Sequence, residues 1–314
     1  MKSVVKEKTD ARAKAGPVGR SLPFVSVVVA TIGRGRLLIQ TVRGLLENDY
    51  PNFEVIVVDQ TPQPERDVLR FMEGDSARIR YVRRRQPGLP DARNAGVGAA
   101  RGDIVLFVDD DVVVGPSLIA AHARAYADSA VGGVAGRVLP PGDTPRETEH
   151  RPTRIAKVRY FGLVIRDHFD ADVRTEADHV RGCNMSFLRR AITDAGGFDG
   201  RFGGSAHLEE TDLAFRVRAA GYRLVFEPEA SLVHLLEAAG GCRPRNPGEW
   251  FFWYGHNVCL FYRKNFPSAF FALSSAYFAA RLGMSAIKNR DIHIVVWGIK
   301  GFIRGLKTYR RGAA

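Results

Sequence analysis

Three consecutive aspartates, Asp109, Asp110 and Asp111, follow an apolar run in the stretch IVLFVDDDVVV. Carboxylates this close repel one another, and removal from water raises the energy of each charged form. A hard divalent cation would relieve the repulsion, because it prefers oxygen ligands and also binds diphosphate oxygens. The spacing therefore predicts that Asp109 and Asp111 share a cation with a phosphorylated ligand. The alternative is a set of helix-capping or solvated turn residues.

A second acidic group lies in the stretch EETDLAFRVRAAGYRL, which contains Glu209, Glu210 and Asp212. A carboxylate within hydrogen-bond reach of a hydroxyl group can accept its proton as a general base. The same residues also suit the first turn of a helix, where negative charge is favourable. Both interpretations are open at the level of the sequence.

The elements that must position these acids are short apolar strands alternating with amphipathic helices. Between residues 24 and 138 the chain contains four strand-like runs, namely FVSVVVA, FEVIVVD, ARIRYV and DIVLFVD. Such alternation predicts right-handed βαβ units and a mostly parallel sheet. Ligands of these sheets bind beyond the carboxyl ends of the strands. Because two of the runs end in Asp59 and Asp109, we expect the chemistry at that edge.

The chain has 314 residues, 45% of them hydrophobic, and a formal net charge of +12. Nucleic acid, anionic lipid and phosphorylated small molecules all suit such a charge. The basic residues are concentrated at the two ends, whereas the centre carries the carboxylates, so we expect no nucleic acid partner. The cysteines, Cys183, Cys242 and Cys259, lack C-x-x-C spacing, so the sequence indicates neither a disulfide framework nor a cysteine zinc site.

The chain resembles the inverting, nucleotide-sugar-dependent glycosyltransferases of family 2. The resemblance covers about residues 24 to 236 and rests on six stretches in family order: VSVVVATIGR, FEVIVVDQT, QPGLPDARNAGVGAARGDIVLFVDDD, RGCNMSFLRRAITDAGGFD, EETDLAFRVRAAGYRL and SLVH. It implies the α/β GT-A fold, with a Rossmann-like, mostly parallel central sheet flanked by helices. Within the family the chain is similar to non-processive bacterial cell-surface glycan and rhamnosyl-type transferases.

The resemblance also implies a binding site for the nucleotide-sugar donor. Thr31 and Asp59 would line the pocket for the base and ribose, and Arg93 would face the donor. Asp109 and Asp110 would contact the nucleotide sugar, which is expected to be a UDP-, dTDP- or GDP-sugar.

Metal and base assignments come from the same resemblance. Asp109, Asp111 and His234 would hold Mg²⁺ or Mn²⁺. The alternative for His234 is a hydrogen-bonded histidine at the sheet edge. Glu210 occupies the position of the catalytic base, which is usually an aspartate in the family. Glu209 and Asp212 would assist it. The expected site residues are therefore Thr31, Asp59, Arg93, Asp109, Asp110, Asp111, Glu209, Glu210, Asp212 and His234.

The expected reaction moves a sugar from the nucleoside diphosphate to a hydroxyl acceptor with inversion. One carboxylate base on one side and one metal ion on the other would suffice for it. The acceptor would be a glycan or a lipid-linked molecule. A nucleotidyltransferase with the same acidic metal site is the alternative, and it would release pyrophosphate instead of a nucleoside diphosphate.

Three parts are expected along the chain. Residues 1–22 form a flexible basic arm without the apolar core of a secretory signal, and residues 23–240 form the catalytic domain. That domain divides into a nucleotide-sugar half at about 23–139 and an acceptor half at about 140–240. Residues 241–314 form a C-terminal amphipathic helical region.

The C-terminal region predicts membrane attachment. Residues 281–314 carry eight Lys or Arg and one acid among aromatic and aliphatic residues, which suits a helix lying on an anionic membrane surface. The uninterrupted apolar stretch Ala269 to Ala280 is too short to span a bilayer, so no membrane-spanning segment is expected. We therefore expect a cytoplasmic protein that is peripheral on the inner face of the cell membrane. A helical hairpin packed on the catalytic domain is the alternative.

Processive synthases of the family usually carry a Gln-x-x-Arg-Trp motif after the base. No glutamine follows Gln86 in this chain. A distributive enzyme that adds one or a few sugars is therefore expected.

Overall fold

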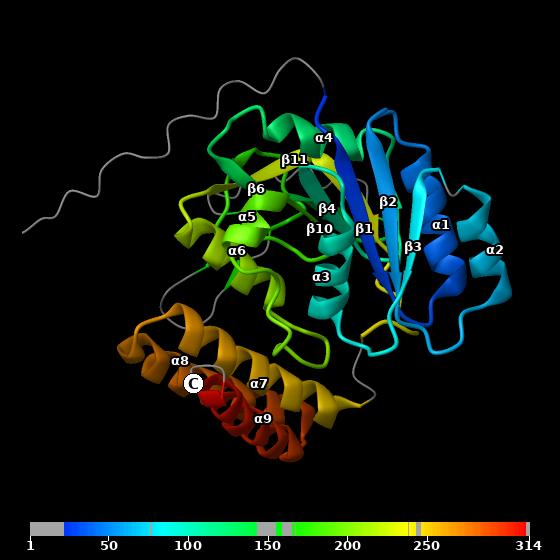
Figure 1. Cartoon of the computed structure of the whole chain (residues 1–314). Coiled ribbons are helices and arrows are strands. Elements are labelled where there is room, and N and C mark those ends of the chain that lie inside the picture. The colour runs from blue at the N-terminus through cyan, green and yellow to red at the C-terminus, as the bar shows by residue number, and fades with distance from the viewer. Residues whose placement is uncertain are drawn as a thin grey trace, which may run out of the picture.

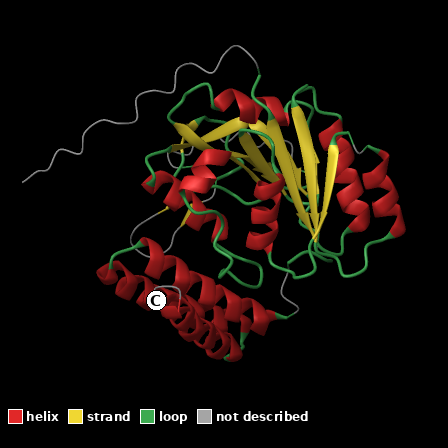
Figure 2. Cartoon of the chain, viewed as in Figure 1, coloured by secondary structure: helices red, strands yellow, loops and turns green. Residues whose placement is uncertain are grey.

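The structure is a computed structural model that describes residues 22–75, 77–142, 155–158, 165–166, 168–237, 239–242 and 246–311. It consists of an α/β layer structure followed by a group of three long helices (Figures 1 and 2). The predicted basic arm lies outside the described residues except for Leu22, and so does much of residues 140–178.

The first half of the sheet is the parallel unit that the sequence predicts. Its strands are β1 (Val25–Thr31), β2 (Phe53–Asp59), β3 (Ile79–Arg83) and β4 (Ile104–Val108), in the spatial order β3-β2-β1-β4. Every residue of β2 and β4 is buried, as expected for strands covered on both faces. The parallel register places Thr31 opposite Asp59, so the polar ends of β1 and β2 are neighbours.

The second half of the sheet is mixed. It contains β5 (Val112–Val114), β6 (Val131–Leu139), β9 (Thr175–Glu176), β10 (Asn184–Leu188) and β11 (Arg223–His234). The strand β10 runs antiparallel to both β4 and β6, whereas β11 is parallel to β6 and antiparallel to β5. Two short strands, β7 (Lys157–Val158) and β8 (Ile165–Arg166), pair separately.

Helices cover the sheet on both sides. Those of the α/β part are α1 (Gly35–Leu46), α2 (Arg66–Gly74), α3 (Leu89–Ala99), α4 (Leu118–Ala125), α5 (Arg189–Asp194) and α6 (Glu209–Ala219). The crossovers through α1 and α3 advance in opposite directions across the sheet, so their right-handedness puts them on opposite faces. Helix α3 can approach β1 closely because Gly96 faces Val28, where a side chain would collide.

Three C-terminal helices follow the sheet, α7 (Pro247–Asn265), α8 (Ser268–Asn289) and α9 (His293–Arg311). Figure 1 shows them as a separate layer below the open end of the sheet. Gly298 of α9 faces Leu282 of α8, and Gly301 and Gly305 of α9 face the backbone and side chains of α7. The absence of side chains at Gly301 and Gly305 lets the axes of α7 and α9 come close together.

Helix α8 corrects one expectation. Over 22 residues, with a mean hydropathy of 1.3 in its most apolar window, it is long and apolar enough to cross a membrane, and only 22% of that window is buried. The expectation of no segment of membrane length is therefore wrong by length and composition. It counted only the unbroken stretch that ends at Ala280, whereas the helix continues through Arg281 to Asn289.

Candidate active site

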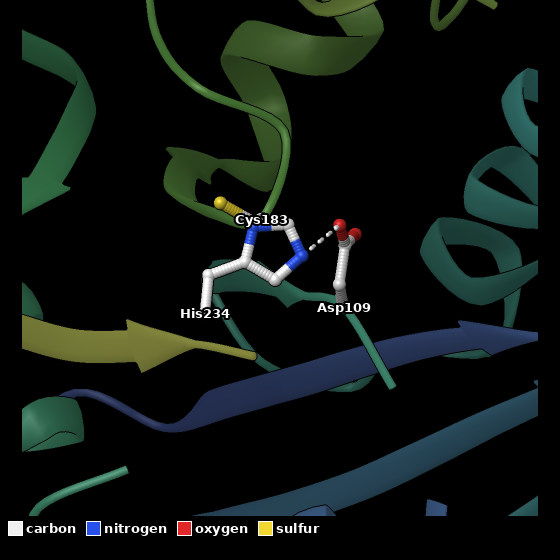
Figure 3. Close-up of side chains that lie close together, drawn as sticks. All are labelled: Asp109, Cys183 and His234. Carbon is white, nitrogen blue, oxygen red and sulfur yellow. Dashed lines mark ion pairs between the residues drawn. The ribbon is translucent and has the colours of Figure 1, made fainter. Parts of the chain in front are cut away.

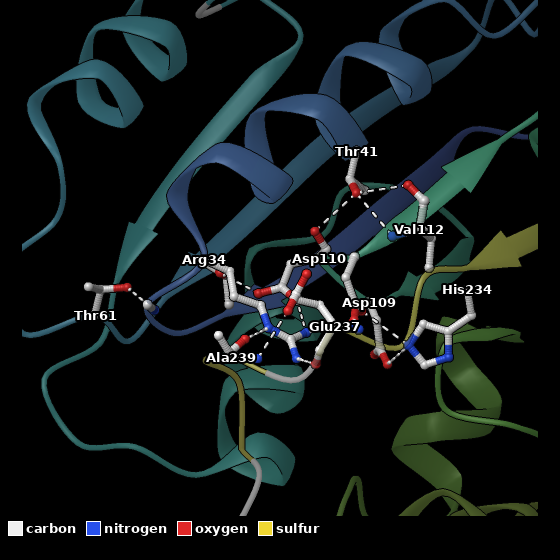
Figure 4. A network of polar contacts seen from close by, with 12 residues as sticks. Arg34, Thr41, Thr61, Asp109, Asp110, Val112, His234, Glu237 and Ala239 are labelled. Carbon is white, nitrogen blue, oxygen red and sulfur yellow. Dashed lines mark hydrogen bonds and ion pairs between the residues drawn. The ribbon is translucent and has the colours of Figure 1, made fainter. Parts of the chain in front are cut away.

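The carboxyl ends of β1 and β4, the start of α6 and the end of β11 meet at one edge of the sheet. Figure 4 shows part of this polar network, in which Asp109 and Asp110 lie between Arg34 and His234. Strand β1 pairs with β4, and β11 pairs with β5, which directly follows the triple aspartate. This backbone pairing fixes the positions from which the side chains of the site project.

Asp110 is almost fully buried in a neutralising environment. Its Oδ2 accepts a hydrogen bond of 2.6 Å from the Thr31 hydroxyl, and its Oδ1 accepts one of 2.8 Å from Arg34. Burial nevertheless raises the pKa of Asp110 to about 6, because Thr31 and Arg34 offset only part of the desolvation. Thr31 thus lies next to the triple aspartate, and its expected role in the nucleotide pocket stays a prediction.

Asp111 is fully buried and held from three directions. Its Oδ2 lies 3.0 Å from Arg34 Nη1 and accepts a hydrogen bond of 3.0 Å from the Glu237 N–H, and its Oδ1 lies 3.1 Å from His234 Nε2. Burial alone would raise the pKa of Asp111, but His234, Arg34 and the Glu237 N–H together lower it. A metal ion at Asp111 would therefore have to replace part of this existing charge neutralisation.

Asp109 is the accessible member of the three, with a side chain that is 34% exposed. Its carboxylate lies 3.7 Å from His234 Nε2 and 3.6 Å from Arg93. Cys183 is the third residue beside it, and the potential ligand atoms of Asp109, Cys183 and His234 all lie within 4.8 Å of one another (Figure 3). Burial, and then the charge of Asp109, raise the pKa of the Cys183 thiol.

Arg93 connects the triple aspartate with the second acidic group. Its guanidinium group is 4% exposed and forms ion pairs with Asp109 and with Glu209 at the start of α6. It also donates a hydrogen bond of 2.9 Å to the Gly182 carbonyl and lies over the Phe198 ring. Arg93 thus lies between the two acidic groups and neutralises Glu209, and its expected role facing the donor stays a prediction.

Asp212 faces another direction. Its Oδ1 accepts a hydrogen bond of 2.9 Å from Asn265, and its Oδ2 accepts bonds from Arg216 (2.9 Å) and Lys264 (2.8 Å). Lys264 also binds Asp199, so these contacts join α6 and its approach to α7. The structure therefore gives Asp212 a role in holding the C-terminal helices, and its predicted role as a helper of the base stays a prediction.

Glu210 is the second residue of α6 and is partly exposed. The preceding Leu208 has a left-handed conformation, with φ of 74°, and this turn brings the chain into the helix. Glu209 points to Arg93 and Asp212 to α7, which leaves Glu210 as the most accessible acid of this turn.

Asp59 ends β2 next to the site and is buried. It accepts hydrogen bonds of 2.7 Å from the Thr61 N–H and 2.5 Å from the Tyr81 hydroxyl, and it pairs with Arg83. Burial and the bond to Asp59 raise the pKa of Tyr81 to about 12, so Tyr81 stays a hydrogen-bond donor at neutral pH. The Thr61 hydroxyl in turn accepts a bond from the Gly33 N–H, which ties the loop after β1 to this side of the site (Figure 4).

Two residues at the site were not found from the sequence. Arg34 belongs to the run GRGR, which looks like an exposed basic loop, yet its side chain is 6% exposed and binds Asp110, Asp111 and the Glu237 and Ala239 carbonyls. Cys183 carries no spacing signal, because its neighbours Asp109 and His234 are distant in sequence. Only the tertiary packing brings either residue to the site.

A cavity of about 230 Å³ adjoins the site on the side of β6. It is lined by His234 and by eight further residues, Val138, Leu139, Pro140, His168, Phe169, Asp170, Arg181 and Leu236. His234 thus contacts both the triple aspartate and this cavity.

The model of the family described as glycosyl transferase family 2 matches residues 26–197. The chain belongs to glycosyltransferase family 2. The match ends before α6, so the family assignment rests on the sheet, the triple aspartate and β10, and the acids of α6 lie beyond it.

Relatives of this glycosyltransferase share moderate identity with it. An uncharacterised protein of Sinorhizobium fredii is 32% identical over 253 residues, which cover 70% of this chain but a quarter of the relative's length. The glucosyl-dolichyl phosphate glucuronosyltransferase of Haloferax volcanii is 24% identical over 220 residues, or 68% of this chain and 69% of the relative.

Among solved structures, the mannosyltransferase PcManGT of Pyrobaculum calidifontis, in complex with GDP-Man and Mn²⁺, is similar with a TM-score of 0.57 and 18% identity. The similarity covers 95% of this chain and 90% of that one. At this identity it shows the fold, and the GT-A architecture expected from the sequence is thereby confirmed.

Proposed function

We propose that this glycosyltransferase moves a sugar from a nucleoside diphosphate sugar to a hydroxyl group of a lipid-linked or glycan acceptor, with inversion of configuration. The observation that carries the proposal is the buried Arg93, which pairs with Asp109 on the donor side and with Glu209 at the start of α6. The Arg93 guanidinium group thus holds close together the two acidic groups that the reaction needs.

The donor would lie along the carboxyl ends of β1, β2 and β4. Asp59, fixed by Tyr81 and Thr61, would accept hydrogen bonds from the base or ribose. The diphosphate would approach Asp109, the most accessible of the three aspartates. Binding of GDP-Man by PcManGT supports a nucleotide-sugar donor in this fold.

The charges of the site suit a divalent cation. Four carboxylates, those of Asp109, Asp110, Asp111 and Glu209, face two guanidinium groups, those of Arg34 and Arg93. When all six groups are ionised, their net charge is −2. Asp109, Asp111 and His234 would hold Mg²⁺ or Mn²⁺, which, when bound, would stabilise the charge that develops on the leaving diphosphate.

Glu210 would accept the proton of the acceptor hydroxyl. A positioned carboxylate base contributes roughly 10² to 10⁴ in rate. Glu209 cannot take this role as long as Arg93 neutralises it, and Asp212 is bound to Lys264. A single base opposite the leaving group produces inversion.

The acceptor would be presented at the cytoplasmic face of the cell membrane, and transfer would be distributive. The name of the Haloferax volcanii relative, which includes a dolichyl phosphate, supports a lipid-linked acceptor. Exposed Val296, Ile299 and Ile303 recur every three or four residues along α9 and form an apolar stripe, which the exposed Ile292 extends just before the helix. Lys300 and Arg304 on the same helix would meet anionic headgroups.

Calorimetric titration with UDP-, dTDP- and GDP-sugars tests the proposal. We expect one donor to bind only with Mn²⁺ or Mg²⁺ present, and the Asp109→Asn and Asp111→Asn variants to lose most of that affinity. Product analysis with a suitable acceptor should find a nucleoside diphosphate. Unchanged donor affinity in both variants contradicts the site, and release of pyrophosphate would identify a nucleotidyltransferase instead.

A further inference from the structure

The metal position contains a sulfur atom that an ordinary magnesium site lacks. Cys183 is 3% exposed, and its thiol lies with a carboxylate oxygen of Asp109 and a ring nitrogen of His234 in a group whose ligand atoms are all within 4.8 Å. Figure 3 shows the three side chains converging from different segments of the chain. Oxygen, nitrogen and sulfur donors together suit a different range of cations from oxygen donors alone.

Strand pairing holds the three residues in place. Asn184 at the start of β10 is paired with Val108 at the end of β4, so Cys183 and Asp109, the next residues outward, are brought side by side. His234 at the end of β11 is paired with Val112 on β5, just beyond the triple aspartate. The Asn184 amide further anchors β10 by donating to the Arg137 and Ala230 carbonyls at 2.8 Å each. Asp109 and Cys183 each lie one residue beyond a paired strand and His234 ends one, so strand pairing positions the cluster.

The distances are close to those of a coordinated ion. In a tetrahedral zinc site the metal lies about 2.3 Å from sulfur and about 2.0 Å from nitrogen or oxygen, which separates the ligand atoms by roughly 3.3 to 3.6 Å. The Asp109 and His234 atoms are already 3.7 Å apart. Every pair of ligand atoms lies within 4.8 Å, so shifts of at most about 1.5 Å would complete the set.

We propose that this position binds thiophilic divalent cations such as Zn²⁺, Cd²⁺ and Co²⁺ through Cys183, His234 and Asp109, in competition with Mg²⁺ or Mn²⁺. On binding, the S–H bond of Cys183 breaks, a sulfur–metal bond forms and the proton passes to solvent. This inference rests on the proposed function, because the same position would hold the ion that assists donor binding. It adds that Zn²⁺ inhibits the enzyme.

The test is a titration of the full chain with Co²⁺ and Cd²⁺, followed by ultraviolet and visible absorption. Thiolate coordination produces a charge-transfer band that nitrogen and oxygen ligands do not. We expect the band in the natural chain, its loss in Cys183→Ala, and its retention in the control variants Cys242→Ala and Cys259→Ala. Calorimetry should show that Cys183→Ala lowers the ratio of Cd²⁺ to Mg²⁺ affinity. Thermal unfolding of each variant establishes that it is folded.

The outcomes separate the inference from the proposed function. A band that persists in Cys183→Ala, or disappears only in Cys242→Ala, overturns the assignment of the ligand. A natural chain without the band that still binds its donor with Mn²⁺ overturns the inference and leaves the proposed function standing. A chain that binds no divalent cation, and binds a sugar nucleotide equally well without one, contradicts both.

Discussion

The α/β part of the chain and its three C-terminal helices differ in which side chains are buried and which are exposed. In the α/β part, charged groups such as Arg34, Arg93 and Asp111 are buried at one edge of the sheet, each paired with an opposite charge. In α7 to α9 and their connections, large apolar side chains are exposed instead. Nine of the twelve exposed large apolar residues of the described chain are found there: Trp250, Leu273, Met284, Ile287, Ile292, Val296, Trp297, Ile299 and Ile303.

This difference teaches that the two parts face different environments. Buried charges that neutralise one another form a preorganised polar site for a small charged ligand. A concentration of exposed apolar residues indicates a surface that is covered by a protein partner or a membrane. We therefore propose that chemistry and attachment belong to separate parts, which are joined by contacts that include Lys264. Variants in one part should leave the property of the other part unchanged.

The largest effect is expected from Glu210→Gln, because an amide cannot accept the acceptor proton. Transfer should fall by roughly 10² to 10⁴, whereas donor affinity and binding to lipid vesicles should stay the same. Steady-state transfer assays and donor calorimetry measure this. Glu209→Gln is the control for an adjacent acid and should act mainly by freeing Arg93. A larger loss of transfer in Glu209→Gln than in Glu210→Gln would place the base on the other residue.

The second-largest effect is expected at the joint between the two parts, which is formed by Lys264 and its ion pairs. Lys264 is 13% exposed and pairs with Asp199 and Asp212. Lys264→Met removes the cationic partner of both carboxylates, while Arg201, Arg216 and Asn265 still contact them. It should therefore lower the free energy of unfolding by about 2 kcal/mol, as is typical for a lost hydrogen bond to a charged group. Denaturant unfolding measures the change, and Lys288→Met on α8 is the control for loss of a lysine that forms no ion pair in the described chain. Equal stability of both variants would show that the joint is unimportant.

The same joint predicts a dependence on pH. Burial alone would raise the pKa of Asp199, but hydrogen bonds from Arg201 and Lys264 lower it well below its ordinary value. Its stabilising contribution is therefore fully present above the unfolded pKa of about 4 and is lost as the pH falls toward the folded pKa. Unfolding measured between neutral and acid pH should show a steeper loss of stability below about pH 4 in the natural chain than in Lys264→Met.

A moderate effect is expected on membrane attachment. Ile287 is 80% exposed and Ile292 is 68% exposed. Changing both to Asp should release the protein from anionic vesicles, because it removes two apolar side chains. Each of them would contribute up to about 1.5 to 3 kcal/mol when buried in the membrane. Vesicle sedimentation measures the bound fraction. Val113→Asp changes an aliphatic residue of the α/β part with 55% exposure, and it should remain bound. Equal release of both proteins would contradict the division of roles.

The smallest effect concerns single charges on α9. Lys300→Gln should weaken binding to anionic vesicles by about 1 kcal/mol, or roughly fivefold, since one cation near the headgroups is lost. The difference should disappear in high salt, which screens the lipid charge. Arg70→Gln removes an exposed charge from α2 and serves as the control. If Arg70→Gln weakens binding as much, the attraction comes from net charge and not from α9.

The sequence by itself determined the parallel half of the sheet and which acids lie at its carboxyl edge. Periodicity located β1 to β4, because apolar β-branched runs of this length are buried on both faces. The place of Asp59 and Asp109 at strand ends follows from that, since the carboxyl ends of parallel strands share one edge. It also indicated the basic and aromatic character of the C-terminal helices. It missed the full length of α8, because a single Arg281 interrupts the apolar stretch without ending the helix.

Only the tertiary structure decided which charges are neutralised and by which partner. Arg34 and Asp110 are 76 residues apart, and Cys183 and Asp109 are 74 residues apart, so local pattern carries no information about either contact. Likewise, Glu209 and Asp212 are neighbours on one helix turn, yet Glu209 forms an ion pair with Arg93 and Asp212 forms one with Lys264. A side chain's chemistry depends on its partners and its burial, and both are created when distant strands and helices pack together.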